Sequence, residues 1–437
     1  METLNKKNKI LMGMTLFSMF FGAGNLIFPP FLGAQAGQAT VQAMVGFALS
    51  AIGLPILGVI AVTKSGGLEE LTSRVHKKFS FVYILLLYLS IGPCLAIPRT
   101  ASTSFSMAVV PFVKETKGQY QIIYSIVFFV IAMLIALKPE KLTEYLGKKL
   151  TPCLLILILV IFVGCLVHPA GNFAVPTKEY QGQPVVTGFL NGYQTMDTLA
   201  GLNFGMIIAM NIQTKGISSK KSIMKETINA GWIAGVILLC VYGMLAYVGA
   251  LSSETFAGAK DGTETLTSLT QFLFGRVGLL LLAIIFVIAC LNTCIGLLSC
   301  CGKYFNSIVP KISYRNWVFI FAFISAVISN VGLQNILELS VPVLNALYPV
   351  AIVLIILAYA HPLIKNYMEI YPWVIACCGI SSIVSALAQK GIHILGITTW
   401  VKSIPLYELG FGWVIPSLAG VVLAVIFHKI KIQAKKI

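Results

Sequence analysis

Few side chains of this 437-residue sequence could do chemistry, and the most conspicuous of them lie inside apolar segments. Asp197 is the only acidic residue placed well within such a segment, and Arg99 lies inside another. Ionisable residues inside a lipid bilayer are costly and mark candidate functional sites. A buried carboxylate can serve proton coupling or a binding site, whereas Arg99 stays charged and must face protein or water. The structural alternatives are an N-cap role for Asp197 and interfacial snorkelling for Arg99.

Two apolar segments carry helix-breaking residues at their centres. The first contains FFGAGNLIFPPF at residues 20–31, and the second contains TMDTLAGLNFG from Thr195 onward. A break leaves unpaired amides at the start of one half-helix and unpaired carbonyls at the end of the other, which is tolerated only where they line a cavity or bind ligands. The amide end favours a carboxylate and the carbonyl end a cation. The alternative is close helix packing by small and hydroxyl residues.

Two further segments carry polar residues suited to a central site. One contains IGPCLAIPRTASTSF, in which Pro93 and Pro98 interrupt the helix just before Arg99. The other contains ACLNTCIGLLSCC, whose polar residues Asn292, Thr293 and Ser299 lie on or near one helical face. Hydroxyl oxygens are ligands that a hard cation such as Na⁺ needs, although such hydroxyls also bond back to their own helix.

The composition predicts an all-α integral membrane protein. Of the residues, 57% are hydrophobic and 11% are charged, and the mean hydropathy is +0.89. Segments long enough to cross a bilayer as helices recur along the chain, each needing about 20 residues. We predict twelve spans, at 10–31, 40–63, 79–112, 120–137, 150–168, 187–212, 227–250, 272–302, 316–331, 338–360, 371–388 and 411–428.

The net charge of +16 predicts an orientation in the membrane rather than nucleic-acid binding, because the basic residues cluster between apolar runs. With the N-terminus inside, most of the 31 lysines and arginines fall on the cytoplasmic side. Six fall outside: Lys114, Lys117, Lys178, Lys260, Lys390 and Lys402. The pattern favours twelve spans with both termini cytoplasmic.

Breaks at spans one and six are typical of a five-plus-five inverted repeat, with the two breaks meeting near the bilayer midplane. We therefore expect a transporter core over 1–360, built from repeats at 10–168 and 187–360. The region 361–437 then adds two peripheral helices and a cytoplasmic tail. No soluble domain is expected.

Four motifs resemble the bacterial branched-chain amino-acid:cation symporters of the BrnQ type. They are GAGNLIFPP in the first span, GPCLAIPRTA in the third, TMDTLAG in the sixth and SVPVLNALYP in the tenth. The resemblance covers essentially the whole chain, and it implies the leucine-transporter fold and sodium-coupled uptake of leucine, isoleucine and valine.

The resemblance also implies site residues. In this fold a GxGN pattern, here Gly22, Gly24 and Asn25, binds the substrate carboxylate. The predicted substrate site comprises Ala23, Gly24, Asn25, Pro98, Arg99, Thr195, Met196, Asp197, Thr198 and Gly201. The predicted sodium site comprises the carbonyls of Ser18 and Phe21 with Thr293, and Asn292 stands where many members of the fold have a second hydroxyl residue. No cofactor is implied beyond Na⁺ as the coupling ion.

These observations predict a monomeric sodium-coupled importer of branched-chain amino acids in a bacterial plasma membrane. A proton-coupled permease that uses Asp197 is the main alternative. Proton coupling is disfavoured because all five histidines lie at span ends or in loops. A channel needs a continuous polar pore, whereas the polar residues cluster near one depth. An enzyme needs a nucleophile with its base or a metal set, and the sequence places neither at a suitable depth.

Overall fold

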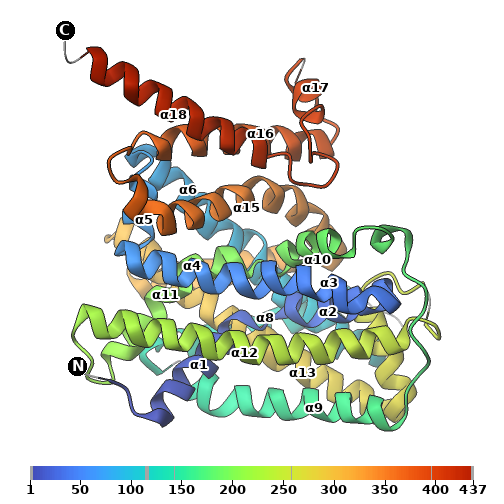
Figure 1. Ribbon diagram of the computed structural model, residues 1–437. Helices are drawn as coiled ribbons and strands as arrows, with labels where there is room; N and C mark the ends of the chain where they lie inside the picture. The colour runs from blue at the N-terminus through green and yellow to red at the C-terminus, as the bar shows by residue number, and fades with distance from the viewer. Residues whose placement is uncertain (1–2, 114–117, 142, 257, 395, 435–437) are drawn as a thin grey trace.

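The apolar segments fold as helices in the computed structural model, which describes residues 3–113, 118–141, 143–256, 258–394 and 396–434 (Figure 1). Within these ranges the chain forms no strand, which confirms the predicted all-helical class. Helices satisfy their own backbone hydrogen bonds, as a lipid environment requires. Lys114 and Lys117, which the charge pattern assigns to the outer side, and the chain ends at 1–2 and 435–437 lie outside the described residues.

In its described residues, the first half of the chain contains nine α-helices. They are α1 (Lys6–Phe20), α2 (Ala23–Ala36), α3 (Thr40–Ala48), α4 (Leu54–Ser65), α5 (Leu68–Ser73), α6 (Lys77–Leu89), α7 (Ala96–Ala108), α8 (Gly118–Ala136) and α9 (Thr151–Val167). Single π-helical segments join α3 to α4 at Leu49–Gly53 and α6 to α7 at Ser90–Cys94. Asn5 begins α1 as an N-cap, because its side chain accepts a hydrogen bond from the Asn8 amide at 2.8 Å.

The second half also contains nine α-helices within the described ranges. They are α10 (Pro184–Gly192), α11 (Asp197–Gln213), α12 (Lys220–Ser252), α13 (Gly262–Ile308), α14 (Tyr314–Ser329), α15 (Leu333–Ile364), α16 (Ile370–Gln389), α17 (Ile397–Lys402) and α18 (Val414–Ala434). Helix α13 bends sharply at Gly275, where φ is 57°. Asp261 and Ser313 cap the starts of α13 and α14.

Nine helical runs in the described part of the chain are long and apolar enough to cross a membrane, fewer than the twelve predicted spans. The difference arises at the breaks. The predicted spans 10–31 and 187–212 each divide into two shorter helices, and α14 has only 16 residues. The run Ala23–Ser65 in turn joins α2 to the following predicted span. Helix length alone therefore undercounts crossings wherever a helix is interrupted.

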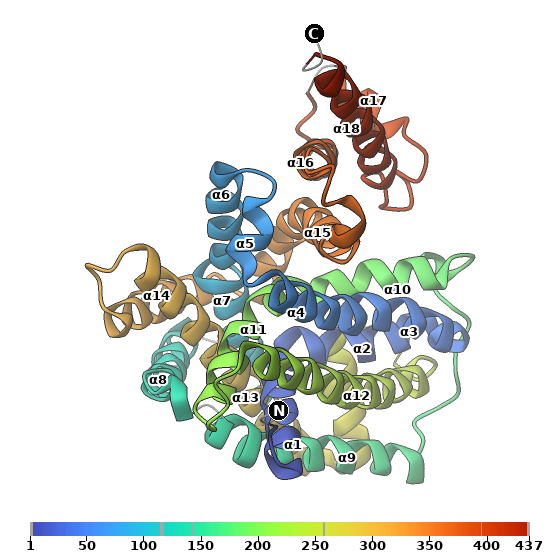
Figure 2. The same ribbon diagram turned by 60° about the vertical axis from the view of Figure 1, so that its left-hand side comes forward.

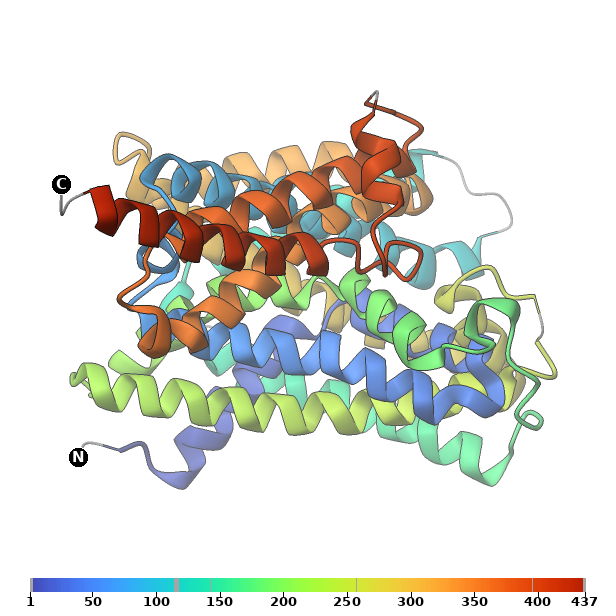
Figure 3. The same ribbon diagram turned by 45° about the horizontal axis from the view of Figure 1, so that its top comes forward.

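The helices pack side by side, with the broken ones inside. Helices α1 and α2 pack along α12, α10 packs on α3, and α11 packs on α4. Helix α16 packs on α15 and α18 on α16, so the C-terminal helices lie at one side of the bundle (Figure 2). The start of α1 and the end of α18 lie at the same end of the bundle (Figures 1 and 3).

Helices α2 and α12 approach each other closely because glycines form both sides of the contact. A Cβ atom on Gly249 would lie 1.9 Å from the Pro30 carbonyl oxygen, and one on Gly33 would lie 1.9 Å from that of Ala246. Small residues allow such backbone contact between membrane helices. The contact fixes α2, and with it the break that precedes α2, against α12.

We predict that Gly249→Ala destabilises the protein by about 1–3 kcal/mol, because the added methyl group meets rigid backbone. The measurement is thermal unfolding of the purified protein in detergent. Gly243→Ala is the matched control on the same helix, since a Cβ there meets nothing within 4 Å. Equal melting temperatures for the two variants would refute the tight α2–α12 contact.

Candidate functional site

The first break separates α1 from α2 at Phe21 and Gly22. The Gly22 amide, which would continue the α1 hydrogen-bond ladder, instead donates to Asn25 Oδ1 at 3.1 Å. The first amide of α2 to find a carbonyl acceptor in its own helix is that of Leu26, which donates to Gly22 at 3.2 Å. The amides of Ala23, Gly24 and Asn25 therefore have no acceptor within α2, and a helix terminus of this kind favours negative charge.

The second break separates α10 from α11. A 3₁₀ turn at Tyr193–Thr195 follows α10, and Met196 then adopts a left-handed conformation with φ of 65° before α11 begins at Asp197. This backbone region is uncommon for a residue other than glycine. The sequence suggests that the glycines of the segment break the helix, but Gly201 and Gly205 lie inside α11. The carbonyls of Gln194 and Thr195 at this break accept hydrogen bonds from a side chain of another helix.

Arg99 connects the two breaks. Its Nη1 donates to the Gln194 carbonyl at 2.8 Å, and its Nη2 lies 3.5 Å from the Thr195 carbonyl. A Cβ on Gly24 would lie 2.7 Å from Nη2, so this glycine allows the guanidinium to reach the start of α2. Only 3% of Arg99 is exposed, which rules out interfacial snorkelling. The guanidinium thus lies between the unpaired amides of α2 and the carbonyls of the second break, to which it donates.

A second cluster joins the same breaks through Asn25, Asp197 and Tyr242 of α12. Asn25 Nδ2 donates to Asp197 Oδ2 at 2.5 Å and also to the Tyr242 hydroxyl. That hydroxyl donates to the same carboxylate oxygen at 3.1 Å. All three side chains are buried. The Asp197 carboxylate therefore faces the start of α2 and does not cap its own helix.

Tyr242 is the residue that sequence reasoning missed. It lies in the apolar segment 227–250, which also contains Tyr247, and it has no charged or amide residue beside it. A tyrosine in an apolar span is an ordinary core residue, so nothing in the local sequence distinguishes it. Only the packing of α12 along α2 brings its hydroxyl to Asp197.

The two breaks enclose a small cavity of about 20 Å³, which is room for roughly one water molecule. Most of the predicted site residues line it: Ala23, Gly24, Asn25, Arg99, Thr195, Met196, Asp197 and Thr293. Side chains from α1, α7, α11 and α13 complete the wall, including Phe20, Thr100, Ala200 and Leu297. Residues from four predicted spans thus meet at one point, as the sequence analysis expects of a central site.

Three residues of the predicted substrate site lie elsewhere. Thr198 donates to the Ser50 carbonyl at 3.3 Å, in the π-helical segment before α4. Gly201 faces Pro55, whose carbonyl oxygen would lie 2.7 Å from an added Cβ. Pro98 is buried in the first turn of α7 but does not line the cavity. Thr198 and Gly201 therefore pack α11 against the predicted span 40–63, the close-packing role that the sequence analysis weighs as the alternative.

The predicted sodium ligands lie where α13 meets the end of α1. Thr293 Oγ1 donates to the Met19 carbonyl at 3.1 Å, and a Cβ on Gly22 would lie 2.5 Å from the same hydroxyl. The Ser18 hydroxyl and the Asn292 amide are buried, and within the described residues they have no hydrogen-bond partner. The Phe21 ring stacks on Phe17 at a centroid distance of 5.0 Å. Thr293 is thus the predicted ligand that touches both the cavity and a free carbonyl of α1.

Two larger cavities adjoin the broken helix pair α10 and α11. The first, of about 430 Å³, is lined by Tyr193 and Gln194 and by residues of α15 and α16. The Tyr193 ring stacks on Tyr348 at 4.4 Å. The second, of about 580 Å³, lies among the ends of α4 and α11 and the start of α12. The first cavity is therefore next to the second break, whereas the second lies at the far end of α11.

Solved structures with a similar fold include a cation symporter. The chain matches the inward-facing conformation of Mhp1 with a TM-score of 0.59 at 12% identity, covering 99% of this chain and 95% of that one. It also matches Mhp1, described as a nucleobase-cation-symport-1 family transporter, in a closed conformation, with a TM-score of 0.54 at 13% identity and coverage of 94% and 91%. These matches support the expected leucine-transporter-like fold.

Sequence relatives extend over nearly the whole chain. The chain is 37% identical over 425 residues to the branched-chain amino acid permease BraB of Bacillus subtilis, covering 97% of this chain and 96% of the relative. It is 36% identical over 430 residues to the permease BrnQ of Escherichia coli K12, covering 98% and 97%. The family model described as "Branched-chain amino acid transport protein" matches residues 5–431. The resemblance seen in the sequence motifs is confirmed, and the chain belongs to the branched-chain amino acid transport protein family.

Proposed function

We propose that this chain is a sodium-coupled symporter that imports leucine, isoleucine and valine across a bacterial plasma membrane by alternating access. The relatives named as branched-chain amino acid permeases support the substrate class. The observation that carries the mechanism is the juxtaposition of free α2 amides, Arg99 and Asp197 around one closed cavity. This set complements both charges of an amino acid.

The carboxylate of the substrate binds the amides of Ala23, Gly24 and Asn25 together with Arg99. The helix terminus and the guanidinium both favour negative charge, and the planar guanidinium can form two hydrogen bonds with a carboxylate. The ammonium group faces Asp197 and the carbonyls at the end of the second break. Because the cavity holds only about one water molecule, substrate entry requires the surrounding helices to move apart.

The aliphatic side chain of the substrate occupies space lined by apolar residues such as Ile91, Ala200 and Leu297. Such a pocket discriminates by apolar burial, at about 0.8 kcal/mol per CH₂ group. Leucine is therefore strongly preferred to alanine, whereas leucine and isoleucine, which have equal carbon counts, are poorly separated.

Sodium binds between the end of α1 and α13. Its ligands are Thr293 and the carbonyls of Ser18 and Phe21, and Asn292 takes the place of a second hydroxyl ligand. The unpartnered Ser18 hydroxyl and Asn292 amide beside this junction support the assignment. Na⁺ and substrate stabilise the same conformation, so each raises the affinity for the other. The second candidate function is a proton-coupled permease of the same fold. The observation behind it is the buried Asp197 carboxylate, which could carry the proton.

The proposed topology has twelve spans with both termini cytoplasmic, and the protein acts as a monomer. Repeats at 10–168 and 187–360 form the core, and 361–437 supply two peripheral helices and the tail. The position of both chain ends at one end of the bundle supports an even number of crossings (Figure 3).

Uptake of radiolabelled leucine into proteoliposomes under separate Na⁺ and H⁺ gradients tests the coupling ion. We expect accumulation driven by the Na⁺ gradient, with competition from isoleucine and valine but not from alanine. Accumulation driven by H⁺ alone and abolished by Asp197→Asn would replace the sodium mechanism with the proton mechanism. Leucine uptake absent under every gradient would refute the substrate assignment.

Arg99→Gln is expected to raise the KM for leucine at least roughly ten-fold, because hydrogen bonds to charged groups contribute about 1.5–3 kcal/mol. Arg99→Lys keeps the charge but cannot form the bidentate hydrogen bond with the carboxylate, so an intermediate KM is expected. Arg315→Gln, at the start of α14, is the matched control. An unchanged KM in Arg99→Gln would remove Arg99 from the substrate site.

Thr293→Ala is expected to raise the Na⁺ concentration for half-maximal uptake by about ten-fold, because the variant lacks a ligand oxygen. Thr293→Ser retains the hydroxyl and should restore the wild-type value. The measurement is the Na⁺ dependence of leucine uptake at saturating leucine. Wild-type Na⁺ dependence in Thr293→Ala would exclude this residue as a ligand.

A further inference from the structure

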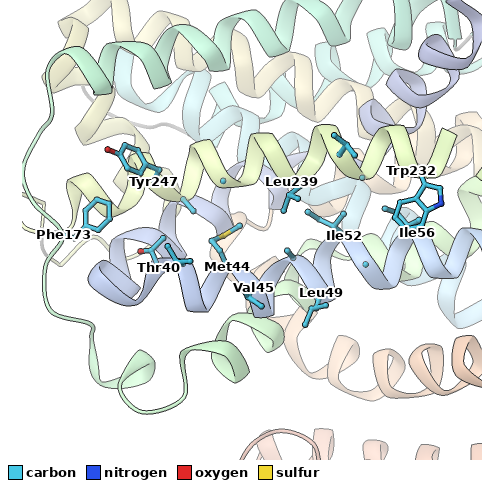
Figure 4. A pocket seen from close by; sticks show the side chains of 17 residues that line it. Thr40, Met44, Val45, Leu49, Ile52, Ile56, Phe173, Trp232, Leu239 and Tyr247 are labelled. Carbon is cyan, nitrogen blue, oxygen red and sulfur yellow. The ribbon is translucent and has the colours of Figure 1, made fainter. Parts of the chain in front are cut away.

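An apolar groove of about 640 Å³ runs along the outside of the protein between α12 and the α3–α4 span. Trp232 lies near one end of the groove, and Tyr247 with Phe173 lies near the other (Figure 4). Its lining is almost entirely aliphatic and aromatic, and no charged residue contributes to it. The groove is separate from the cavity between the two helix breaks, with which it shares no lining residue.

The side chains of the protein leave the groove open. A Cβ on Gly243 would meet nothing within 4 Å, and one on Gly53 would meet only the Ala48 carbonyl oxygen, at 3.8 Å. Around these glycines stand Val41, Leu49 and Val236, each more than half exposed. Because glycine has no side chain, the bottom of the groove is open at these positions. A narrow apolar ligand can lie there between the branched side chains on both sides.

The length of the groove matches a lipid chain rather than a side chain of the protein. Trp232 and Tyr247 are fifteen residues apart on α12, which corresponds to about 22 Å of helix. One leaflet of the hydrocarbon core is about 15 Å thick, half of the core. Trp232 lies five residues inside the predicted span 227–250, so an acyl chain from that side reaches the part of the groove between Trp232 and Leu239 before the bilayer midplane.

Positive charge lies on the same face of α12, just beyond the Trp232 end. Lys225 and Lys221 precede Trp232 by seven and eleven residues, which places all three on one helical face at about 10 and 16 Å spacing along the axis. Lys221 also lines the neighbouring cavity together with Lys64 and Lys220. In the described ranges neither Lys221 nor Lys225 forms an ion pair, whereas the nearby Glu226 pairs with Lys9 at 3.4 Å.

We propose that this groove is a binding site for an anionic phospholipid. One acyl chain lies over Gly53 beside Val236, and the phosphate headgroup binds Lys221 and Lys225. Basic residues at the membrane surface attract anionic headgroups, and the groove supplies the apolar part of the site. In the proposed topology the lipid comes from the cytoplasmic leaflet. The lipid site does not depend on the identity of the substrate or of the coupling ion.

Native mass spectrometry of the purified full chain tests the site directly. The protein is titrated with phosphatidylglycerol and phosphatidylcholine of identical chains, and the fraction of each that stays bound is measured. The wild type should retain phosphatidylglycerol in preference to phosphatidylcholine. The double change Lys221→Gln with Lys225→Gln should weaken phosphatidylglycerol binding by roughly five-fold per lysine and leave phosphatidylcholine unchanged. Lys311→Gln with Lys365→Gln, at other loops on the same side, is the control and should have no effect.

Filling the groove tests the acyl-chain contact. Gly53→Leu should displace both lipids, because the new side chain occupies the space of the acyl chain. Gly379→Leu on α16 is the matched control, since a Cβ there meets only the Val350 side chain at 3.9 Å. Wild-type melting temperature and leucine uptake in Gly53→Leu would show that the fold is intact. Equal retention of the two lipids by the wild type, or unchanged retention after Gly53→Leu, would overturn the proposal.

Discussion

Unpaired backbone groups inside the membrane are the constraint on which this structure depends. Lipid offers no hydrogen-bond partner, so a helix can be interrupted there only where other groups satisfy its ends. The protein interrupts two helices and brings the interruptions together. Arg99 donates to the carbonyls at one break, and the Asn25 side chain connects the Gly22 amide at the other to Asp197. The amides at the start of α2 remain available to a ligand.

Glycine makes this meeting possible because it allows other groups to approach the backbone. Gly24 admits the guanidinium of Arg99, and Gly22 admits the hydroxyl of Thr293. Gly33 and Gly249 in turn hold α2 against α12, the helix that supplies Tyr242. The same contacts leave a small cavity at the centre, and a larger cavity adjoins each half of the broken helix pair α10 and α11. The proposed transport cycle opens the centre alternately to the two sides of the membrane.

Much of this arrangement follows from the sequence. Helix-breaking residues and polar groups in four separate spans predict a central site, and eight of the predicted residues line the cavity. The sequence does not distinguish a glycine that interrupts a helix from one that packs against a neighbour. In the structure Gly201 of α11 packs against α4, and it is Met196 that takes the left-handed conformation at the break. Tyr242 and the Gln194 carbonyl join the site only through tertiary packing, which leaves no local pattern. The number of uninterrupted spans differs from twelve for a related reason, because a break shortens the helices on both sides of it.

The most direct test of the account is competition between labelled leucine and leucinamide for binding to the purified protein in Na⁺. Leucinamide keeps the side chain and the ammonium group but replaces the carboxylate with a neutral amide. If free helix amides and Arg99 recognise the carboxylate, leucinamide should bind at least roughly 100-fold more weakly than leucine, since several charge-assisted hydrogen bonds are weakened together. Leucinamide that competes as well as leucine would contradict the assignment of the two facing helix breaks as the substrate site.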